Sequence, residues 1–142
     1  MTKVINTSIT FMFEEDQAEK YRMTIVKTHR DLDVWKVSMD FVVALYRMTA
    51  TFPNQEKFGL IPQIRRASVS ICSNIAEGAA RNHSKEFLQF LYIALGSVSE
   101  IETQLEISLR LGYISSIDPQ KEILDRLRKM LVNLILAIKR KL

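Results

Sequence analysis

After residue 30, hydrophobic positions recur every three to four residues in four stretches, which is the spacing of helices that bury one face. The sequence predicts helices over Leu32–Thr51, Gly59–Arg81, Ser84–Leu111 and Asp118–Leu142. Asp31 or Asp33 is expected to cap the first helix. Ser84 is expected to cap the third, and Gly112 to end it. Residues 1–30 show no sustained period, so they are taken as an N-terminal extension.

The connections between these helices are short. They comprise Phe52–Phe58, Asn82–His83 and Tyr113–Ile117. A short connection between long helices places the second helix alongside the first in the opposite direction. Only four glycines and three prolines occur, and no strand-like alternation competes, so long helices are favoured over a sandwich or barrel. The predicted fold of residues 31–142 is therefore all-α, an antiparallel up-down-up-down four-helix bundle.

Small and polar residues occupy much of the second helix, in the stretch QIRRASVSICSNIAEGAAR. Its predicted core stripe is Leu60, Ile64, Ala67, Ile71, Ile75 and Gly78. The opposite face is mostly serine and alanine, and the third helix carries a second stripe that mixes isoleucines with a glycine. Such faces are unusual for solvent, so a second copy of the chain is expected to cover them. The predicted oligomer interface consists of Arg66, Ser70, Ser73, Ala76, Glu77, Ile93, Gly96, Glu100 and Ile107.

The net charge of +4 is concentrated in the last helix. From Lys121 onward there are seven Lys and Arg residues against Glu122 and Asp125, so this segment carries +5 and the preceding chain −1. An anionic partner is expected to meet this face, where its phosphates would contact basic side chains. The candidates are Lys121, Arg128, Lys129, Lys139, Arg140 and Lys141. The alternative is an ordinary solvated face, although Val132 and Leu136 lie among these cations.

Several blocks of residues from Asp31 to Ser115 resemble a bacterial family, the four-helix bundle proteins of 23S rRNA intervening sequences. These blocks are DLDVW, FP followed by FGL, QIRRASVSICSNIAEG, EFLQFLYIALGSVSEIETQL and LGYI. The resemblance implies assembly into a homopentameric ring. It also implies kinship with accessory proteins of diversity-generating retroelements, whose partners are RNA and a reverse transcriptase. Cys72 departs from the family, which has a proline or a small residue there, and the change is expected to be harmless.

The sequence offers little support for metal or nuclease chemistry. A di-metal site in a bundle needs Glu-x-x-His pairs, but neither His29 nor His83 follows a glutamate by three residues. Arg22 and His29 have the R-x6-H spacing of some helical RNases, yet the pair falls in the extension and such a spacing arises often by chance. There is no glycine-rich phosphate loop and no set of side chains for covalent catalysis.

Arg66, Glu77 and Glu100 form either a proton-transfer group or a charge network that fixes assembly, and the second interpretation is favoured. A single cysteine, Cys72, fits a reducing compartment, and we expect a cytoplasmic protein without a membrane segment. The sequence thus predicts a non-enzymatic oligomer that needs no cofactor and binds RNA or DNA through phosphates, together with a protein partner. The alternative function is a purely structural or protein-interaction module.

Overall fold

The computed structural model describes residues 28–142, and its regular elements are all helical. Four long helices are present: α3 (Asp33–Thr49), α4 (Leu60–Ala79), α5 (Ser84–Arg110) and α6 (Asp118–Lys139). Two short 3-10 turns, η1 (His29–Asp31) and η2 (Asn54–Glu56), precede α3 and α4. No strand occurs between residues 28 and 142, so the predicted all-α class is confirmed. Apart from Thr28, His29 and Arg30, the predicted extension lies outside the described residues.

Helix ends agree with the prediction to within about three residues, but two predicted caps are wrong. Leu32 is the N-cap of α3, and Asp33 is the first helical residue. Asp31 is already engaged in η1, where its Oδ2 accepts a hydrogen bond from the Thr28 amide at 3.0 Å. His83, rather than Ser84, caps α5, without a side-chain hydrogen bond.

The core lies between the four helices and is almost entirely aliphatic. Every residue predicted for the core stripe of α4 is buried. Leu88 of α5 and Ile135 of α6 also belong to the core. The largest fully buried side chains come from all four helices and are Phe41, Leu45, Ile64, Ile71, Ile75, Leu91, Val98, Ile101, Leu105, Leu124, Leu127 and Leu131. Burying these side chains is the main stabilising contribution to the fold.

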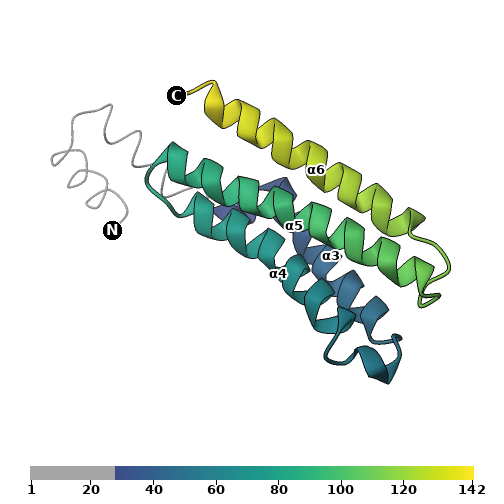
Figure 1. Ribbon diagram of the computed structural model, residues 1–142. Helices are drawn as coiled ribbons and strands as arrows, with labels where there is room; N and C mark the ends of the chain where they lie inside the picture. The colour runs from purple at the N-terminus through teal and green to yellow at the C-terminus, as the bar shows by residue number, and fades with distance from the viewer. Residues whose placement is uncertain (1–27) are drawn as a thin grey trace, which may run out of the picture.

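Helices α4 and α5 lie side by side, with α3 beside α4 and α6 beside α5 (Figure 1). The contact between α4 and α5 is close because small residues line it. A Cβ atom placed on Gly78 would lie 2.7 Å from Phe90 Cβ and 2.7 Å from Phe87 Cδ2. Further along, Ser97 Oγ donates a hydrogen bond to Ser70 Oγ at 2.9 Å. Part of the small, polar character of α4 therefore serves contacts within one chain.

The connections are anchored by side chains of η2 and of the segment after α5. Glu56 accepts hydrogen bonds from the Leu60 amide at 2.8 Å and from the Tyr113 hydroxyl at 2.9 Å. Gly112 follows α5 with φ of +76°, a left-handed conformation that glycine adopts without strain. Among residues 28–142, no helix is both long and apolar enough to cross a membrane.

Candidate functional site

The basic side chains predicted on the last helix are mostly exposed. Lys121, Lys129 and Lys139 lie on α6, while Arg140 caps it and Lys141 follows. Lys139 Nζ lies 5.4 Å from the centroid of the Tyr92 ring of α5. Apart from Arg128, none of the predicted cations forms an ion pair with a carboxylate of residues 28–142. Arg126 is a further exposed cation on this helix that the prediction omitted.

Arg128 is placed differently from its neighbours on α6. Its side chain is 33% exposed and donates hydrogen bonds to Glu102 of α5 and to Asp125, the latter at 3.0 Å. Lys121 also faces acidic residues, because it lines an open cavity between α5 and α6 together with Glu102 and Glu106. Among the α6 cations, the uncompensated positive charge therefore lies on Arg126 and on the residues from Lys129 onward.

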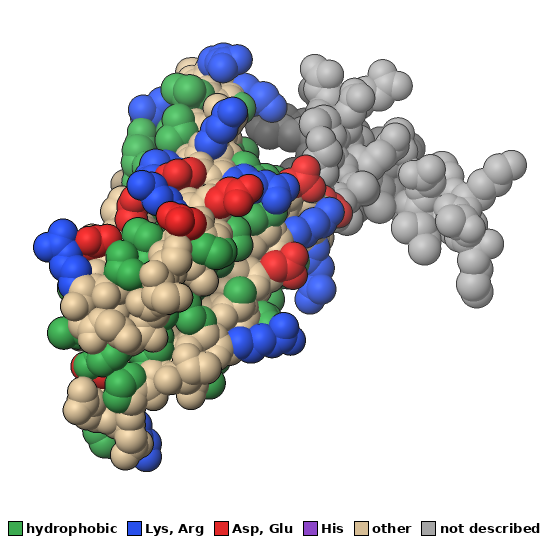
Figure 2. Space-filling model, turned by 90° about the vertical axis from the view of Figure 1, so that its right-hand side faces the viewer, with side chains coloured by type: hydrophobic (Ala, Val, Ile, Leu, Met, Phe, Trp, Pro, Cys, Tyr) green, Lys and Arg blue, Asp and Glu red, His purple; other side chains and the backbone are tan. Residues whose placement is uncertain are grey.

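The face drawn in Figure 2 carries charges of both signs. There, Lys and Arg side chains lie beside Asp and Glu side chains, with hydrophobic side chains distributed between them. Opposite charges placed close together cancel at a distance, so this face offers no extended positive field.

The residues predicted to contact a second copy remain largely uncovered in the single chain. On α5, Ile93 is 52% exposed and Ile107 is 41% exposed. Nothing within 4 Å would meet a Cβ placed on Gly96, so intrachain packing does not require a glycine there. On α4, Ser73 is exposed and Ala76 is half-buried.

Ser70, a member of the predicted interface, forms a hydrogen bond to another helix of the same chain. It is half-buried, since it contacts α5 through its hydrogen bond with Ser97. Its hydroxyl also accepts a hydrogen bond from the Asn74 side chain at 3.0 Å. Ser70 therefore contributes to the contact between α4 and α5 whether or not a second copy binds.

The predicted group of Arg66, Glu77 and Glu100 does not meet within the chain. Glu77 accepts a hydrogen bond from Arg81 at 3.0 Å, one turn further along α4. Glu100 accepts one from the Gln104 side chain at 3.1 Å. Arg66 forms no ion pair with any carboxylate of residues 28–142. Within one chain these three residues thus form neither a proton-transfer group nor a charge network.

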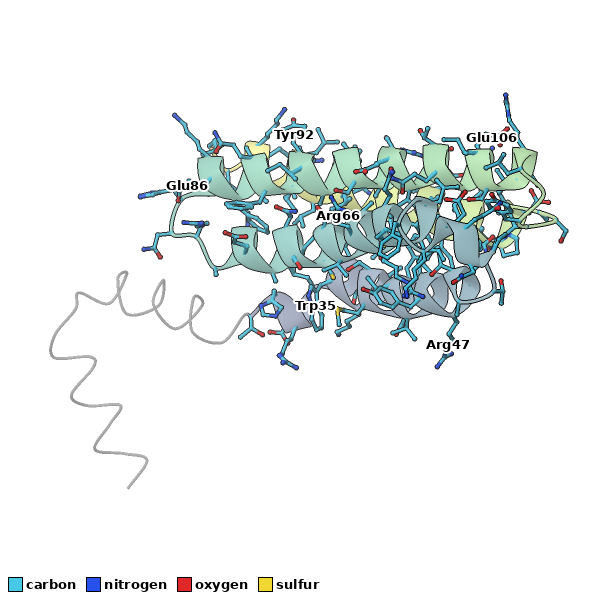
Figure 3. The ribbon with its side chains drawn as sticks, turned by 60° about the horizontal axis from the view of Figure 1, so that its bottom comes forward. Trp35, Arg47, Arg66, Glu86, Tyr92 and Glu106 are labelled. Carbon is cyan, nitrogen blue, oxygen red and sulfur yellow. The ribbon has the colours of Figure 1, made fainter. Side chains whose placement is uncertain are left out.

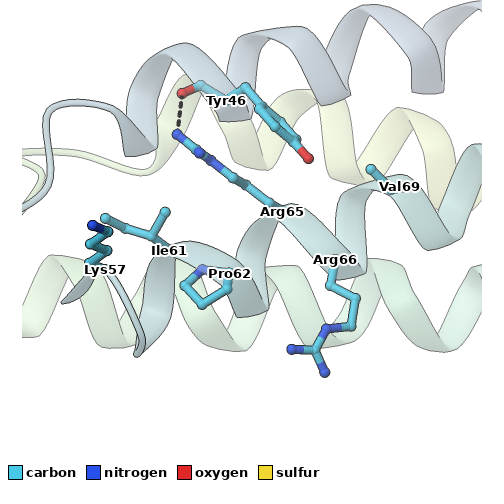
Figure 4. A pocket seen from close by; sticks show the side chains of 7 residues that line it. All are labelled: Tyr46, Lys57, Ile61, Pro62, Arg65, Arg66 and Val69. Atoms are coloured by element: carbon cyan, nitrogen blue, oxygen red, sulfur yellow. Dashed lines mark hydrogen bonds between the residues drawn. The ribbon is translucent and has the colours of Figure 1, made fainter.

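A second basic surface, which the prediction omitted, lies between α3 and α4. A cavity of about 470 Å³ is lined by Tyr46, Lys57, Ile61, Pro62, Arg65, Arg66 and Val69 (Figure 4). It continues along α3 into a shallower cavity of about 460 Å³, lined by Val42, Val43, Tyr46, Arg47, Ala50 and Val69. We call these two cavities together the α3–α4 groove. It brings together four cations, and none of its lining residues is acidic.

Arg65 holds the wall of this groove in place. Its Nε donates to Thr49 Oγ1 at 2.9 Å, and its Nη2 donates to the Tyr46 carbonyl oxygen at 3.3 Å (Figure 4). The guanidinium carbon lies 4.5 Å from the centroid of the Tyr46 ring, within the range of a cation–π contact. All three partners are neutral, so they orient Arg65 without cancelling its charge.

No group of three His, Cys, Asp or Glu side chains is placed to hold a metal ion between residues 28 and 142. His29 packs edge-on against Trp35, with ring centroids 5.0 Å apart. Its predicted partner Arg22 lies outside the described residues. Burial raises the pKa of the Cys72 thiol, which favours the unreactive protonated form.

Comparison with known proteins places this bundle in a family. A family described as the 23S rRNA-intervening sequence protein matches residues 30–133, which is most of the chain. The chain belongs to this family. The match extends past the predicted resemblance, which stopped at Ser115, and reaches into α6.

One solved structure is similar over most of its length. It is a protein of unknown function of the S23 ribosomal protein family from Bacteroides thetaiotaomicron, with 29% sequence identity and a TM-score of 0.62. The similarity covers 72% of this chain and 97% of that protein. No curated protein matches the chain. The comparisons therefore support a family and a shared fold for this chain, and they assign no activity to it.

Proposed function

We propose that this member of the 23S rRNA-intervening sequence family is a non-enzymatic, cytoplasmic scaffold that binds RNA through its phosphates. The unit would be the antiparallel up-down-up-down bundle predicted from the short connections. Copies of it would assemble into an oligomer, and the resemblance to ring-forming relatives favours a pentamer. A reverse transcriptase is the kind of protein partner that the same resemblance suggests.

The observation that carries RNA binding is the set of exposed cations in the C-terminal half of α6. Lys129, Lys139 and Arg140 have no acidic partner among residues 28–142, so their charge is available to phosphates. Each Lys or Arg that neutralises a phosphate releases bound counterions, which adds affinity that falls as salt rises. An oligomer would repeat this surface in every subunit and so increase avidity.

The observation that supports assembly is the apolar surface left open on α5. Ile93 and Ile107 lie seven residues, about two helical turns, to either side of Glu100, so the three side chains share one face of the helix. Both isoleucines are more than two-fifths exposed. Gly96 lies between Ile93 and Glu100, and the space around it leaves room for close approach of another chain. A second copy packed here would remove this apolar surface from water.

Any subunit that packs on this face of α5 must provide a hydrogen-bond or ion-pair partner for the Glu100 carboxylate. Its side chain is exposed in the single chain, so a partner covering this face of α5 would have to satisfy its carboxylate. Arg66 of α4 is exposed and has no acidic partner within residues 28–142. A second copy could therefore supply Arg66 as the cation that pairs with Glu100.

Fluorescence anisotropy with a labelled RNA hairpin, measured over a salt series, tests RNA binding. We expect the quadruple variant K129Q/K139Q/R140Q/K141Q to bind more weakly and with a shallower salt dependence, because fewer counterions are released. A charge-matched comparison uses two double variants: K129Q/K139Q should bind more weakly, whereas K36Q/K85Q, which removes exposed lysines of α3 and α5, should leave the affinity close to that of the wild type. Negligible binding by the wild type at low salt would refute the proposal.

Light scattering after size exclusion tests assembly. A pentamer would have about five times the chain's mass of 16.4 kDa. Ser73→Arg or Ala76→Arg should lower that mass while circular dichroism stays helical, because a long cation on this face of α4 would obstruct a neighbouring subunit. A wild-type chain that runs as a monomer would refute assembly.

The alternative is a structural or protein-interaction module that ignores RNA. One observation favours it: Lys139, Arg140 and Lys141 lie at the C-terminal end of α6, where cations stabilise a helix through its dipole. That role needs no ligand. It predicts that the quadruple variant loses helix stability and that RNA binding is absent in both proteins.

A further inference from the structure

The α3–α4 groove combines uncompensated positive charge with an apolar floor. Lys57, Arg65 and Arg66 line its deeper part, and Arg47 lines its extension along α3. Figure 3 shows Arg47 pointing away from the body of the bundle, on the opposite side from Tyr92 and Glu106 of α5. The apolar lining consists of Ile61, Pro62 and Val69 beside the Tyr46 ring. A ligand that fits must therefore carry both negative charge and an apolar surface.

An exposed aromatic side chain, Phe58, directly follows Lys57, a lining residue of this groove. Phe58 is 90% exposed, the largest exposed fraction among the large hydrophobic residues described. It follows Lys57, whose Nζ lies 5.6 Å from the centroid of the Phe58 ring. Tyr46 is 42% exposed and is oriented by Arg65. Two aromatic rings thus remain accessible to solvent next to cations.

We propose that the α3–α4 groove binds a single-stranded segment of RNA. Unpaired bases would stack on Phe58 and pack against Tyr46, while Lys57, Arg66 and Arg47 contact the intervening phosphates. Aromatic platforms within a basic groove are the general means by which proteins hold unpaired nucleotides, because each base has a flat apolar face and each phosphate a negative charge. A base-paired helix cannot present its bases in this way. The inference shares its ligand class with the proposed function but rests on a different surface.

Binding of three RNA probes to the full chain tests this inference. The probes are a single-stranded oligouridine of about 12 nucleotides, an abasic strand of the same length and a duplex, all at low salt. We expect the oligouridine to bind more tightly than the abasic strand. Phe58→Ala should weaken oligouridine binding about 5- to 100-fold and leave the abasic strand and the duplex nearly unchanged.

Two conservative variants separate stacking from general hydrophobic contact. Phe58→Tyr should retain the preference for the strand with bases, whereas Phe58→Leu should lose it, because leucine has no aromatic face. Phe58 is so exposed that neither substitution should alter the thermal transition. Equal affinity of the wild type for all three probes would overturn the inference. A lower molar mass of Phe58→Ala would also overturn it, because the ring would then be covered by a second copy.

The same three probes also distinguish a groove that does not bind RNA from an α6 surface that does not bind RNA. If only the α6 surface binds RNA, the three probes bind equally and the quadruple α6 variant weakens all of them, which overturns the groove. If only the groove binds RNA, the α6 variant binds all three probes as the wild type does, with the oligouridine bound more tightly than the abasic strand and the duplex. That second result would support the groove and refute phosphate binding by α6.

Discussion

Substituting Gly78 by alanine tests the close contact between α4 and α5. The added Cβ would lie 2.7 Å from Phe90 Cβ and from Phe87 Cδ2, whereas carbon atoms in contact prefer about 3.5–4.0 Å. The Phe87 ring can rotate away, but Phe90 Cβ is fixed to the α5 backbone, so the helices must shift. Overpacking of this kind costs about 1–3 kcal/mol, offset by at most ~1 kcal/mol of helix propensity. We expect a net destabilisation of about 1–2 kcal/mol.

Urea denaturation at fixed protein concentration measures this loss as a lower midpoint with an unchanged m-value. The melting temperature should fall by roughly 3–8 °C. Gly96→Ala is the matched control, because nothing in the chain lies within 4 Å of the added Cβ. Because Gly96 belongs to the proposed subunit contact, both variants are compared at a protein concentration low enough to give the monomer, where Gly96→Ala should gain about 0.5–1 kcal/mol from helix propensity. Equal gains for both variants would show that α4 and α5 are not in close contact at Gly78.

Three further predictions concern single positions. Arg128→Gln should lower the free energy of unfolding by up to about 1 kcal/mol, because it removes the ion pair with Glu102, and thermal melting would show this loss. In fluorescence anisotropy it should change the RNA affinity less than Lys129→Gln does. Because the pKa of Cys72 is raised by burial, the unfolded thiol ionises at a lower pH than the folded one. The free energy of unfolding should therefore be constant at pH values below the pKa of the thiol in the unfolded chain and should fall as the pH rises above that pKa. Cys72→Ala should lack this fall in denaturation curves measured over the same pH range. Gly112→Ala should cost about 1 kcal/mol because of the positive φ, measured by the same method.

The fold was largely predictable because the residues that recur at helical spacing along each helix are the ones that become buried, as α4 shows. Its stripe of spaced aliphatic residues, such as Ile64, Ile71 and Ile75, is fully buried. Cap residues were less predictable, since a side chain that could cap one helix can be engaged elsewhere. Asp31 is used within η1, and the amide of Leu60 is capped by Glu56 from four residues earlier. Such choices depend on how the connection folds, which helical periodicity does not encode.

The candidate site was only partly predictable because a count of charges does not reveal their partners. The pattern of α6 grouped Arg128 with Lys129, but Glu102 of the neighbouring helix engages the first and not the second. The α3–α4 groove was missed for a related reason. Its cations come from α3, from the connection and from α4, so no single helical face displays them. The visible signal was an aromatic residue beside a lysine, Phe58 after Lys57, in a connection.

Arg66 belongs both to the predicted oligomer interface and to the α3–α4 groove, and one guanidinium does not pair with Glu100 of a second copy and contact an RNA phosphate at the same time. The length of α4 indicates how the groove can bind RNA when the subunit contact leaves Arg66 free. The helix has 20 residues, and Arg66 precedes Ala76 by ten of them, which is about 15 Å along the axis. A subunit that packs on Ser73 and Ala76 can therefore leave the N-terminal turns of α4 open to RNA. If so, Ser73→Arg should lower the molar mass without removing the preference for strands with bases. Loss of both properties together would mean that one groove is completed by two subunits.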